Sequence, residues 1–353
     1  MHPVKRQHLV LMRPGFEGAL KDEFAERFDL PGEVACRAGV SFTETSKLPS
    51  VKSSVFARQS LPRALRCQSD DLNIAVKFVT DRIDVMTKRG NRQSGAWTLH
   101  AFAIDDDDQL KRARDIAKIV MQHVRTKQKD FFTRYVSPED FVKGERSSSD
   151  ILLQVYVPAK DDLWFSTATV ADGVSLWEGG FHRMKTLAGA PSRSASKLEE
   201  ALLNLGTKPT KGETAVDLGA APGGWSFVLA SHGADVIAVD HAKLSIKNLG
   251  KLKGAIEHLQ ENGLKYLPPQ SVDWLVCDMV MGARDTLKVL KTWLDADAMK
   301  HFVVNIKLPK TNPWPQVRDA LALINGYGWD IATGQHLLHD RSEITLLGSK
   351  FKK

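Results

Sequence analysis

The sequence contains no long apolar run, which argues against a helix that crosses a bilayer. Its longest runs, such as the one at residues 9–12, fall far short of the roughly 20 apolar residues that a spanning helix needs. No apolar stretch of adequate length follows Lys5 and Arg6, so we expect no secretory signal peptide. We therefore expect a cytoplasmic protein with no membrane partner.

Cysteine is scarce as well. The three cysteines, Cys36, Cys67 and Cys277, are scattered and form neither a CxxC pair nor a zinc-type spacing. We expect them to be reduced cytosolic thiols. No cluster of ligand residues indicates a metal, so none is expected.

The two commonest phosphate-binding loops are also missing. No Gly-Lys-Ser/Thr triplet marks a P-loop, and no G-x-G-x-x-G marks a dinucleotide fingerprint. The chain carries instead Asp-Leu-Gly-Ala-Ala-Pro-Gly-Gly-Trp at residues 217–225, between apolar runs at 214–216 and 226–230. This pattern predicts a strand, a glycine turn and a helix, with a ligand pocket at the carboxyl end of the strand. A ligand with an adenosine end and no pyrophosphate fits such a loop, and S-adenosylmethionine is one.

The loop residues have distinct expected roles. Gly219, Gly223 and Gly224 leave room for a ligand beside the backbone and can adopt positive φ. Pro222 suits the first turn of a helix, where a missing N–H costs nothing.

Charge is only moderately one-sided. With 49 Lys+Arg against 42 Asp+Glu the formal net charge is +7, and the excess is spread over both halves. A basic balance fits a nucleic-acid partner, although many ordinary proteins are as basic. Because there is no basic tail, a cleft or a face would have to collect the charge.

The pattern of elements changes near residues 180–193. Before this break, strands are expected at residues 9–12, 97–103 and 151–157, helices at 17–28 and 110–124, and an acidic turn at 105–108. The segment at 97–103 is expected to alternate between its two faces, as a strand does. After Pro191, apolar strands alternate with helices, which predicts a mostly parallel sheet covered on both faces. The strands of this second part are expected at residues 214–216, 235–240, 272–278 and 301–307, with a closing pair at 331–338 and 344–347.

Polar residues end the predicted parallel strands. Asp217, Asp240, Asp278 and Lys307 all fall where ligands of such sheets bind. Asp240 is placed to accept ribose hydroxyls, with a solvated strand-end aspartate as the alternative. Lys307 ends a hydrophobic strand, and burial or nearby cations would lower the pKa of such a lysine and let it act as a base.

Two further residues complete this group. Ser196-x-x-Glu199 resembles a capping box, which predicts a helix at residues 197–204 with Lys197 in its first turn. A lysine there opposes the helix dipole, which suggests a functional role, although many surface lysines tolerate the position. Glu343 precedes the last predicted strand.

These residues resemble the Lys-Asp-Lys-Glu tetrad of class I S-adenosylmethionine-dependent 2′-O-ribose methyltransferases. Lys197, Asp278, Lys307 and Glu343 occur in the family's order. More narrowly, the chain is similar to the RlmM family, which methylates a cytidine ribose in bacterial large-subunit (23S) ribosomal RNA. The similar stretches lie at residues 10–17, 55–59, 190–194, 197–201, 215–225, 277–280 and 305–309.

The resemblance implies a domain plan. It places a ferredoxin-like region at residues 1–50, a THUMP RNA-binding region at 51–180 and a Rossmann-like methyltransferase domain at 181–353. The first two regions would be α+β and the third α/β.

The resemblance also implies site residues. Lys307 would be the proton acceptor, with Lys197, Asp278 and Glu343 as its catalytic companions. The cofactor contacts expected from the motifs and the resemblance are Ser194, Asp217, Gly219, Ala221, Pro222, Gly223, Gly224, Asp240, Asn262 and Asp278. At Asn262 this chain departs from a family aspartate; the asparagine keeps an acceptor oxygen and loses the charge.

Several alternatives remain open at this point. A cytosine carbon-5 enzyme needs a catalytic cysteine, but Cys277 falls inside a predicted strand, where a structural role is favoured. A nicotinamide-dependent dehydrogenase disagrees with the glycine spacing. An inactive RNA-binding protein disagrees with the intact tetrad, and methylation of a different RNA stays possible. A monomer is the default, since no heptad or repeat is visible.

RNA contact is expected from the first half. Cations and rings interleave at residues 127–135, which suits phosphate contact and base stacking. A helix with a packed aromatic face is the alternative.

Overall fold

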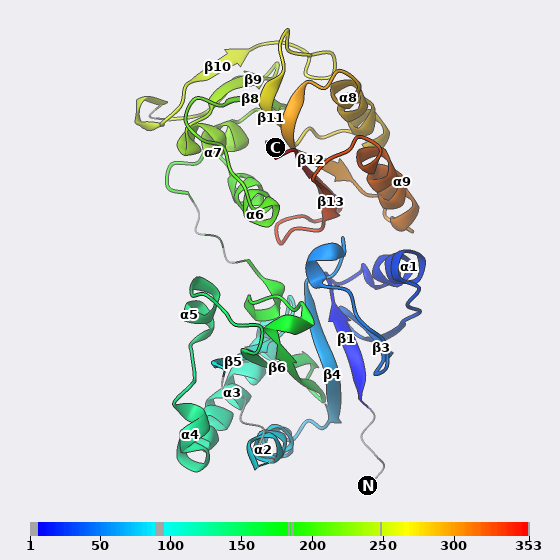
Figure 1. Cartoon of the computed structure of the whole chain (residues 1–353), viewed down its shortest axis with the longest axis vertical. Coiled ribbons are helices and arrows are strands. Elements are labelled where there is room, and N and C mark those ends of the chain that lie inside the picture. The colour runs from blue at the N-terminus through cyan, green and yellow to red at the C-terminus, as the bar shows by residue number, and fades with distance from the viewer. Residues whose placement is uncertain (1–5, 89–94, 183, 185–186, 248, 352–353) are drawn as a thin grey trace. The chain divides into compact units, whose positions relative to one another are not determined.

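The structure is a computed structural model that describes residues 6–88, 95–182, 184, 187–247 and 249–351. The chain divides into two units, one ending at Phe181 and the other beginning at His182. Each unit contains one seven-stranded sheet with its own helices (Figure 1). The expected boundary at residue 50, inside the first unit, stays a prediction.

The elements of the first unit are β1 (Gln7–Leu11), α1 (Glu17–Phe28), β2 (Glu33–Cys36), β3 (Gly39–Thr43), η1 (Val51–Ser53), β4 (Gln59–Gln68), α2 (Leu72–Lys88), β5 (Trp97–Phe102), α3 (Asp107–Lys127), α4 (Lys129–Phe132), α5 (Pro138–Lys143), β6 (Ile151–Ala159), β7 (Asp162–Thr169), η2 (Val170–Asp172) and η3 (Glu178–Gly180). The strand order is β2-β3-β1-β4-β7-β6-β5. The β5–β6 pair is parallel, and the other named pairs are antiparallel. The ten-residue β4 pairs first with β1 and then with β7, so it joins the two parts of this sheet.

Two expectations for the first unit are corrected. The helix expected at residues 110–124 begins earlier, at Asp107, because Asp106 caps it by accepting a hydrogen bond from the backbone N–H of Gln109. The acidic stretch is therefore a helix start. β5 shows no alternation, since all six of its residues are buried. Leu99 and Ala101 pack in the core beneath α2 and α3, while Phe102 packs in a separate core cluster with Tyr156.

The elements of the second unit are α6 (Ala195–Leu205), β8 (Thr214–Leu218), α7 (Gly224–His232), β9 (Asp235–Val239), η4 (Leu249–Lys251), β10 (Ile256–Leu259), β11 (Val272–Cys277), α8 (Ala283–Asp295), β12 (Met299–Lys307), α9 (Trp314–Asn325), β13 (Ile331–Gln335) and β14 (Glu343–Ser349). The strand order is β10-β9-β8-β11-β12-β14-β13. The five strands from β10 to β12 are parallel, as expected, and β14 runs antiparallel between β12 and β13.

Helices cover both faces of this second sheet. Figure 1 shows α6 and α7 on one side and α8 and α9 on the other. The core on the α6 and α7 side includes Leu198, Val228, Trp274 and Leu347, all buried. Because both faces are covered, the strands are mostly apolar, and polar residues inside them such as Asp217 and Asn305 are buried.

Several boundaries in the second unit differ from expectation. α6 begins at Ala195, so the capping box at Ser196 is wrong; Ser194 is the N-cap residue, and its side chain makes no capping bond. β8 continues to Leu218, so Asp217 lies inside the strand. Pro222 precedes α7 instead of lying in its first turn, since the helix begins at Gly224.

Candidate active site

Sheet topology brings four polar side chains to one edge of the second unit. Asp240 and Asp278 directly follow β9 and β11, and Lys307 is the last residue of β12. β14 runs the opposite way, so its first residue, Glu343, pairs in register with Lys307. The carboxyl ends of the parallel strands are where such sheets bind ligands.

The glycine loop after β8 has a backbone that only glycine adopts without strain. Gly219 has φ 76° and Gly223 has φ 109°. A Cβ at Gly219 would collide with Met279, and one at Gly223 would lie 2.5 Å from Ile246 Cγ1. The two glycines therefore also make room for the side chains of Met279 and Ile246. The sequence had indicated only that they make room for a ligand.

The loop is tied down from both sides. The carboxylate of Asp240 accepts hydrogen bonds from the backbone N–H groups of Ala221 (3.0 Å) and Ala242 (2.8 Å). The hydroxyl of Ser194 lies 2.6 Å from that of Ser192, and its carbonyl accepts a bond from the Trp225 indole (2.9 Å). Asp240 and Ser194 therefore lie beside the glycine loop, as expected of residues that share a pocket with it.

Asp217 lies beneath the loop and not at its rim. It is 1% exposed, and its carboxylate accepts a 2.6 Å hydrogen bond from Ser226 Oγ. Burial raises the pKa of this carboxyl to about 7, against the lowering effect of the Ser226 bonds. Through Ser226, Asp217 connects β8 to α7 on the two sides of the glycine loop. Its expected contact with a cofactor stays a prediction.

Asn262 lies in the exposed loop after β10. Its side-chain oxygen accepts a hydrogen bond from the Leu264 N–H (2.9 Å). The next residue, Gly263, approaches the glycine loop, since a Cβ there would lie 3.7 Å from Gly219 N. The asparagine is thus next to the expected pocket.

Two lysines share one glutamate at the strand edge. Lys197 Nζ lies 2.5 Å from Glu343 Oε1, and Lys307 Nζ lies 3.1 Å from Glu343 Oε2. The Lys197 side chain is 12% exposed and that of Lys307 is 37% exposed. Lys197 is therefore the inner, tightly held lysine, and Lys307 is the outer one that faces solvent.

Electrostatics differ within this cluster. Burial lowers the pKa of Lys197, but the carboxylates of Asp278, Asp340 and Glu343 outweigh burial and raise it overall. Burial works to raise the pKa of Glu343, yet the two lysines hold that pKa at about 2. Lys197 and Glu343 are thus a charged pair at neutral pH.

Sequence reasoning missed three residues that complete the cluster. Asp340 lies 3.6 Å from Lys197 Nζ; Asn305 donates a 2.8 Å hydrogen bond to Asp278; and Thr345 bonds to Asn305 (2.6 Å). Asn305 carried a signal, because it interrupts an apolar strand two residues before Lys307 and therefore shares its face. Asp340 lies in the turn before β14 and carried none.

The cysteine that a carbon-5 enzyme would need is buried. Cys277 is 1% exposed and burial raises the pKa of its thiol to about 12, so the structural role is confirmed. His336 is buried and lies after the end of β13, so the strand expected through residue 338 is wrong. Within the described ranges no group of three or more His, Cys, Asp or Glu could hold a metal ion. No described helix has both the length and the apolar character needed to cross a membrane.

Of the aromatic residues at 127–135, Phe131 is buried and Phe132 and Tyr135 are partly buried. Phe131 is 6% exposed and stacks on Trp97 with ring centroids 4.4 Å apart. The expected stacking of a base on Phe131 is therefore wrong, because its ring belongs to the core. Lys127 and Lys129 are exposed and remain able to meet phosphate.

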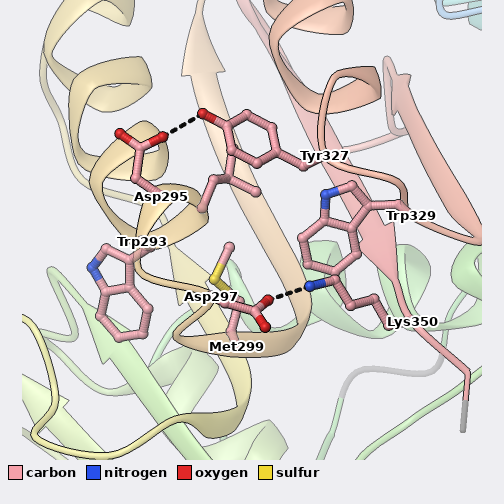
Figure 2. Close-up of a pocket in the computed structure, with 8 residues that line it drawn as sticks. Trp293, Asp295, Asp297, Met299, Tyr327, Trp329 and Lys350 are labelled. Carbon is pink, nitrogen blue, oxygen red and sulfur yellow. Dashed lines mark hydrogen bonds and ion pairs between the residues drawn. The ribbon is translucent and has the colours of Figure 1, made fainter.

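Figure 2 shows a pocket of about 360 Å³ on the second unit, away from the strand edge described above. Its lining includes Trp293, Tyr327, Trp329 and Lys350, and the Tyr327 hydroxyl donates to Asp295 (2.5 Å). This pocket lies near the start of β12. Lys197, Asp278, Lys307 and Glu343, which we call the lysine–glutamate cluster, lie at the other end of that strand.

Comparison with known proteins finds similarity to methyltransferases. Residues 190–310 match the FtsJ-like methyltransferase family. A protein of Alkalilimnicola ehrlichii named Ribosomal RNA large subunit methyltransferase M is 42% identical over 181 residues, which are 48% of this chain and 49% of that protein. A protein of the same name from Stenotrophomonas maltophilia is 39% identical over 184 residues, 50% of this chain and 51% of that protein.

These matches span about half the length of the curated relatives. A solved structure titled as a possible methylase from Clostridium difficile 630 aligns over 99% of both chains, at 10% identity and a TM-score of 0.36. That similarity is too weak to bear on fold or function.

Proposed function

We propose that the chain belongs to the family of the relatives named ribosomal RNA large subunit methyltransferase M, and that its second unit methylates a ribose 2′-hydroxyl of large-subunit ribosomal RNA. The observation that carries the proposal is the pairing of Lys197 and Lys307 with Glu343 at the strand edge. A 2′-hydroxyl is a poor nucleophile at neutral pH and needs a base and alignment. The cytidine expected from the resemblance is part of the proposal.

The residues present fit S-adenosylmethionine, which supplies a methyl group on a sulfonium. Gly219 and Gly223 keep side chains out of the loop after β8, and Asp240 holds that loop through Ala221. The carboxylate of Asp240 keeps further acceptor capacity for ribose hydroxyls. Ser194 and the Asn262 loop flank the same region.

Lys307 acts as the base in this proposal. It is the more exposed lysine and its contact with Glu343 is the longer one, so it can turn toward a substrate while Lys197 stays paired. S-adenosylmethionine, when bound, would supply the methyl group to the 2′-oxygen, and Lys307 Nζ, as the neutral amine, would take the hydroxyl proton. The products are a 2′-methoxy ribose and S-adenosylhomocysteine.

The other members of the cluster orient the reaction. Glu343 holds both lysine side chains, and Asp278, held by Asn305, adds negative charge near Lys197. Much of the acceleration comes from aligning oxygen, methyl carbon and sulfur. The first unit binds RNA in this proposal, with exposed lysines such as Lys127 and Lys129 contacting phosphate.

The test is a methylation assay with labelled S-adenosylmethionine on unmodified bacterial large-subunit ribosomal RNA. Wild type is compared with Lys307→Ala and Lys307→Arg, since arginine keeps the positive charge but cannot accept the proton. Lys288→Ala, at an exposed lysine of α8, is the matched control. We expect both Lys307 variants to lose about 100-fold or more in kcat, a typical loss for a missing general base.

The site of modification is mapped by 2′-O-methyl-sensitive primer extension. A ribose stop with wild type and the control, absent with both variants, supports the proposal. Label on a nucleobase would contradict the assigned reaction. No transfer by wild type that still binds S-adenosylhomocysteine in calorimetry would favour a different RNA or an inactive RNA-binding protein.

A further inference from the structure

A buried series of hydrogen bonds links Asp340, Thr345, Asn305 and Asp278, and we call it the hydrogen-bond chain. Thr345 Oγ1 lies 3.1 Å from Asp340 Oδ2 and 2.6 Å from Asn305 Oδ1. The amide nitrogen of Asn305 in turn donates to Asp278 Oδ1 at 2.8 Å. The chain therefore begins at Asp340 and ends on a member of the cluster.

The other end of the chain reaches a second member. Asp340 Oδ1 lies 3.6 Å from Lys197 Nζ, and its Oδ2 also accepts a bond from the Leu337 N–H (3.0 Å). Asp340 is thus fixed to the turn before β14 and faces the inner lysine.

Burial makes the geometry of the chain rigid. Asp340 and Thr345 are 0% exposed and Asn305 is 3% exposed. Buried polar groups that lose their partners destabilise the fold, so rotation of the Asn305 amide is disfavoured. Its oxygen must face Thr345 and its nitrogen must face Asp278.

We propose that Asp340, Thr345 and Asn305 are positioning residues that hold Lys197 and Asp278 in register with each other. The inference rests on the proposed function, because it assigns those two groups to the reaction. All three residues are buried, so they act on the reaction through Lys197 and Asp278.

Proton positions agree with this arrangement. When Thr345 donates its only hydroxyl proton to Asn305, its oxygen can bond to Asp340 only if that carboxyl is protonated. Burial raises the pKa of Asp340 to about 7, although the nearby Lys197 lowers it and Glu343 raises it further. The protonated form needed for a complete chain is therefore present near neutral pH.

Thr345 permits a sharp test, because its methyl and hydroxyl can be removed separately. Thr345→Ser keeps the hydroxyl and loses the methyl, and Thr345→Val keeps the shape and loses the hydroxyl. If the role is positioning, kcat falls about tenfold or more in Thr345→Val and by less than about threefold in Thr345→Ser, with KM for RNA unchanged in both. If Thr345 serves packing alone, the valine variant has the higher kcat, and the proposal is overturned.

A second measurement does not depend on activity. In protein with ¹³C-labelled aspartate carboxyls, the Asp278 resonance is assigned with Asp278→Asn and followed in both Thr345 variants. We expect it to shift in Thr345→Val and to stay in place in Thr345→Ser, because Thr345 reaches Asp278 only through Asn305. An unchanged resonance in Thr345→Val overturns the inference. If the Asp278 resonance shifts in Thr345→Val but the wild-type protein transfers no methyl group, the hydrogen-bond chain is supported and the proposed function is rejected.

Discussion

The buried aspartate beneath the glycine loop predicts a specific pH dependence of stability. Asp217 is 1% exposed, its carboxylate accepts the Ser226 hydroxyl, and burial raises its pKa from 3.8 to about 7. A carboxyl whose folded pKa is raised stabilises the fold at low pH, and that contribution is lost as pH rises through the folded value. We expect Asp217→Asn to remove this dependence, since asparagine stays neutral.

The magnitude follows from the two pKa values. In the unfolded chain the carboxyl ionises near 3.8, and in the fold only near 7. Between pH 5 and pH 7.5, ionisation of this carboxyl stabilises the unfolded state more than the folded state, by the equivalent of about two pKa units. At 1.36 kcal/mol per unit, wild type should lose about 2.5 kcal/mol of unfolding free energy through this one group over that interval.

Urea unfolding followed by tryptophan fluorescence at pH 5 and pH 7.5 measures the effect. The quantity to compare is the difference between wild type and Asp217→Asn at each pH, because contributions common to both proteins, such as those of Asp340 and Glu343, cancel. Asp285→Asn, at an exposed aspartate of α8, is the control. A difference between wild type and Asp217→Asn that does not change with pH would refute the assignment of a buried, proton-linked carboxyl.

Two other variants test features of the same unit. Gly223→Ala should lose about 1–3 kcal/mol of unfolding free energy and weaken S-adenosylhomocysteine binding in calorimetry, because φ is 109° and Ile246 leaves no room for a Cβ. Gly212→Ala, with φ 87° and open space, should affect stability alone; equal binding losses in the two variants would contradict the loop geometry. Cys277→Ala should keep kcat within about twofold, since a buried thiol with a pKa of about 12 is not a nucleophile at neutral pH. Loss of methyl transfer with a retained thermal midpoint would contradict that.

The sequence predicted the parallel sheet and the members of the lysine–glutamate cluster well. Apolar strands with polar ends are a strong pattern, because both faces of such a sheet are covered and most polar residues fall at the ends. Lys307 was found because it ends such a strand. Glu343 was assigned to the same cluster from the order of the tetrad residues in the sequence. The antiparallel register of β14, which pairs Glu343 with Lys307, is the physical reason that the two lie together.

What the sequence could not predict depends on contacts between distant segments. The capping box at Ser196 failed because α6 begins two residues earlier than expected, with Ser194, which contacts Ser192, as its N-cap residue. β5 lost its alternation because helices and a second core cluster cover its two faces. Asp340 had no local signature, since its importance comes from Lys197, more than a hundred residues away.

The placement of β14 between β12 and β13 has a consequence for biosynthesis. The ion pair between Lys197 and Glu343 joins residues 146 positions apart, so a nascent chain that has exposed α6 and the glycine loop still lacks the glutamate. Until the segment at residues 343–349 leaves the ribosome, the two lysines have no shared carboxylate and β13 has no partner strand among the described elements. A chain truncated before Glu343 would therefore retain the loop and both lysines but not their alignment.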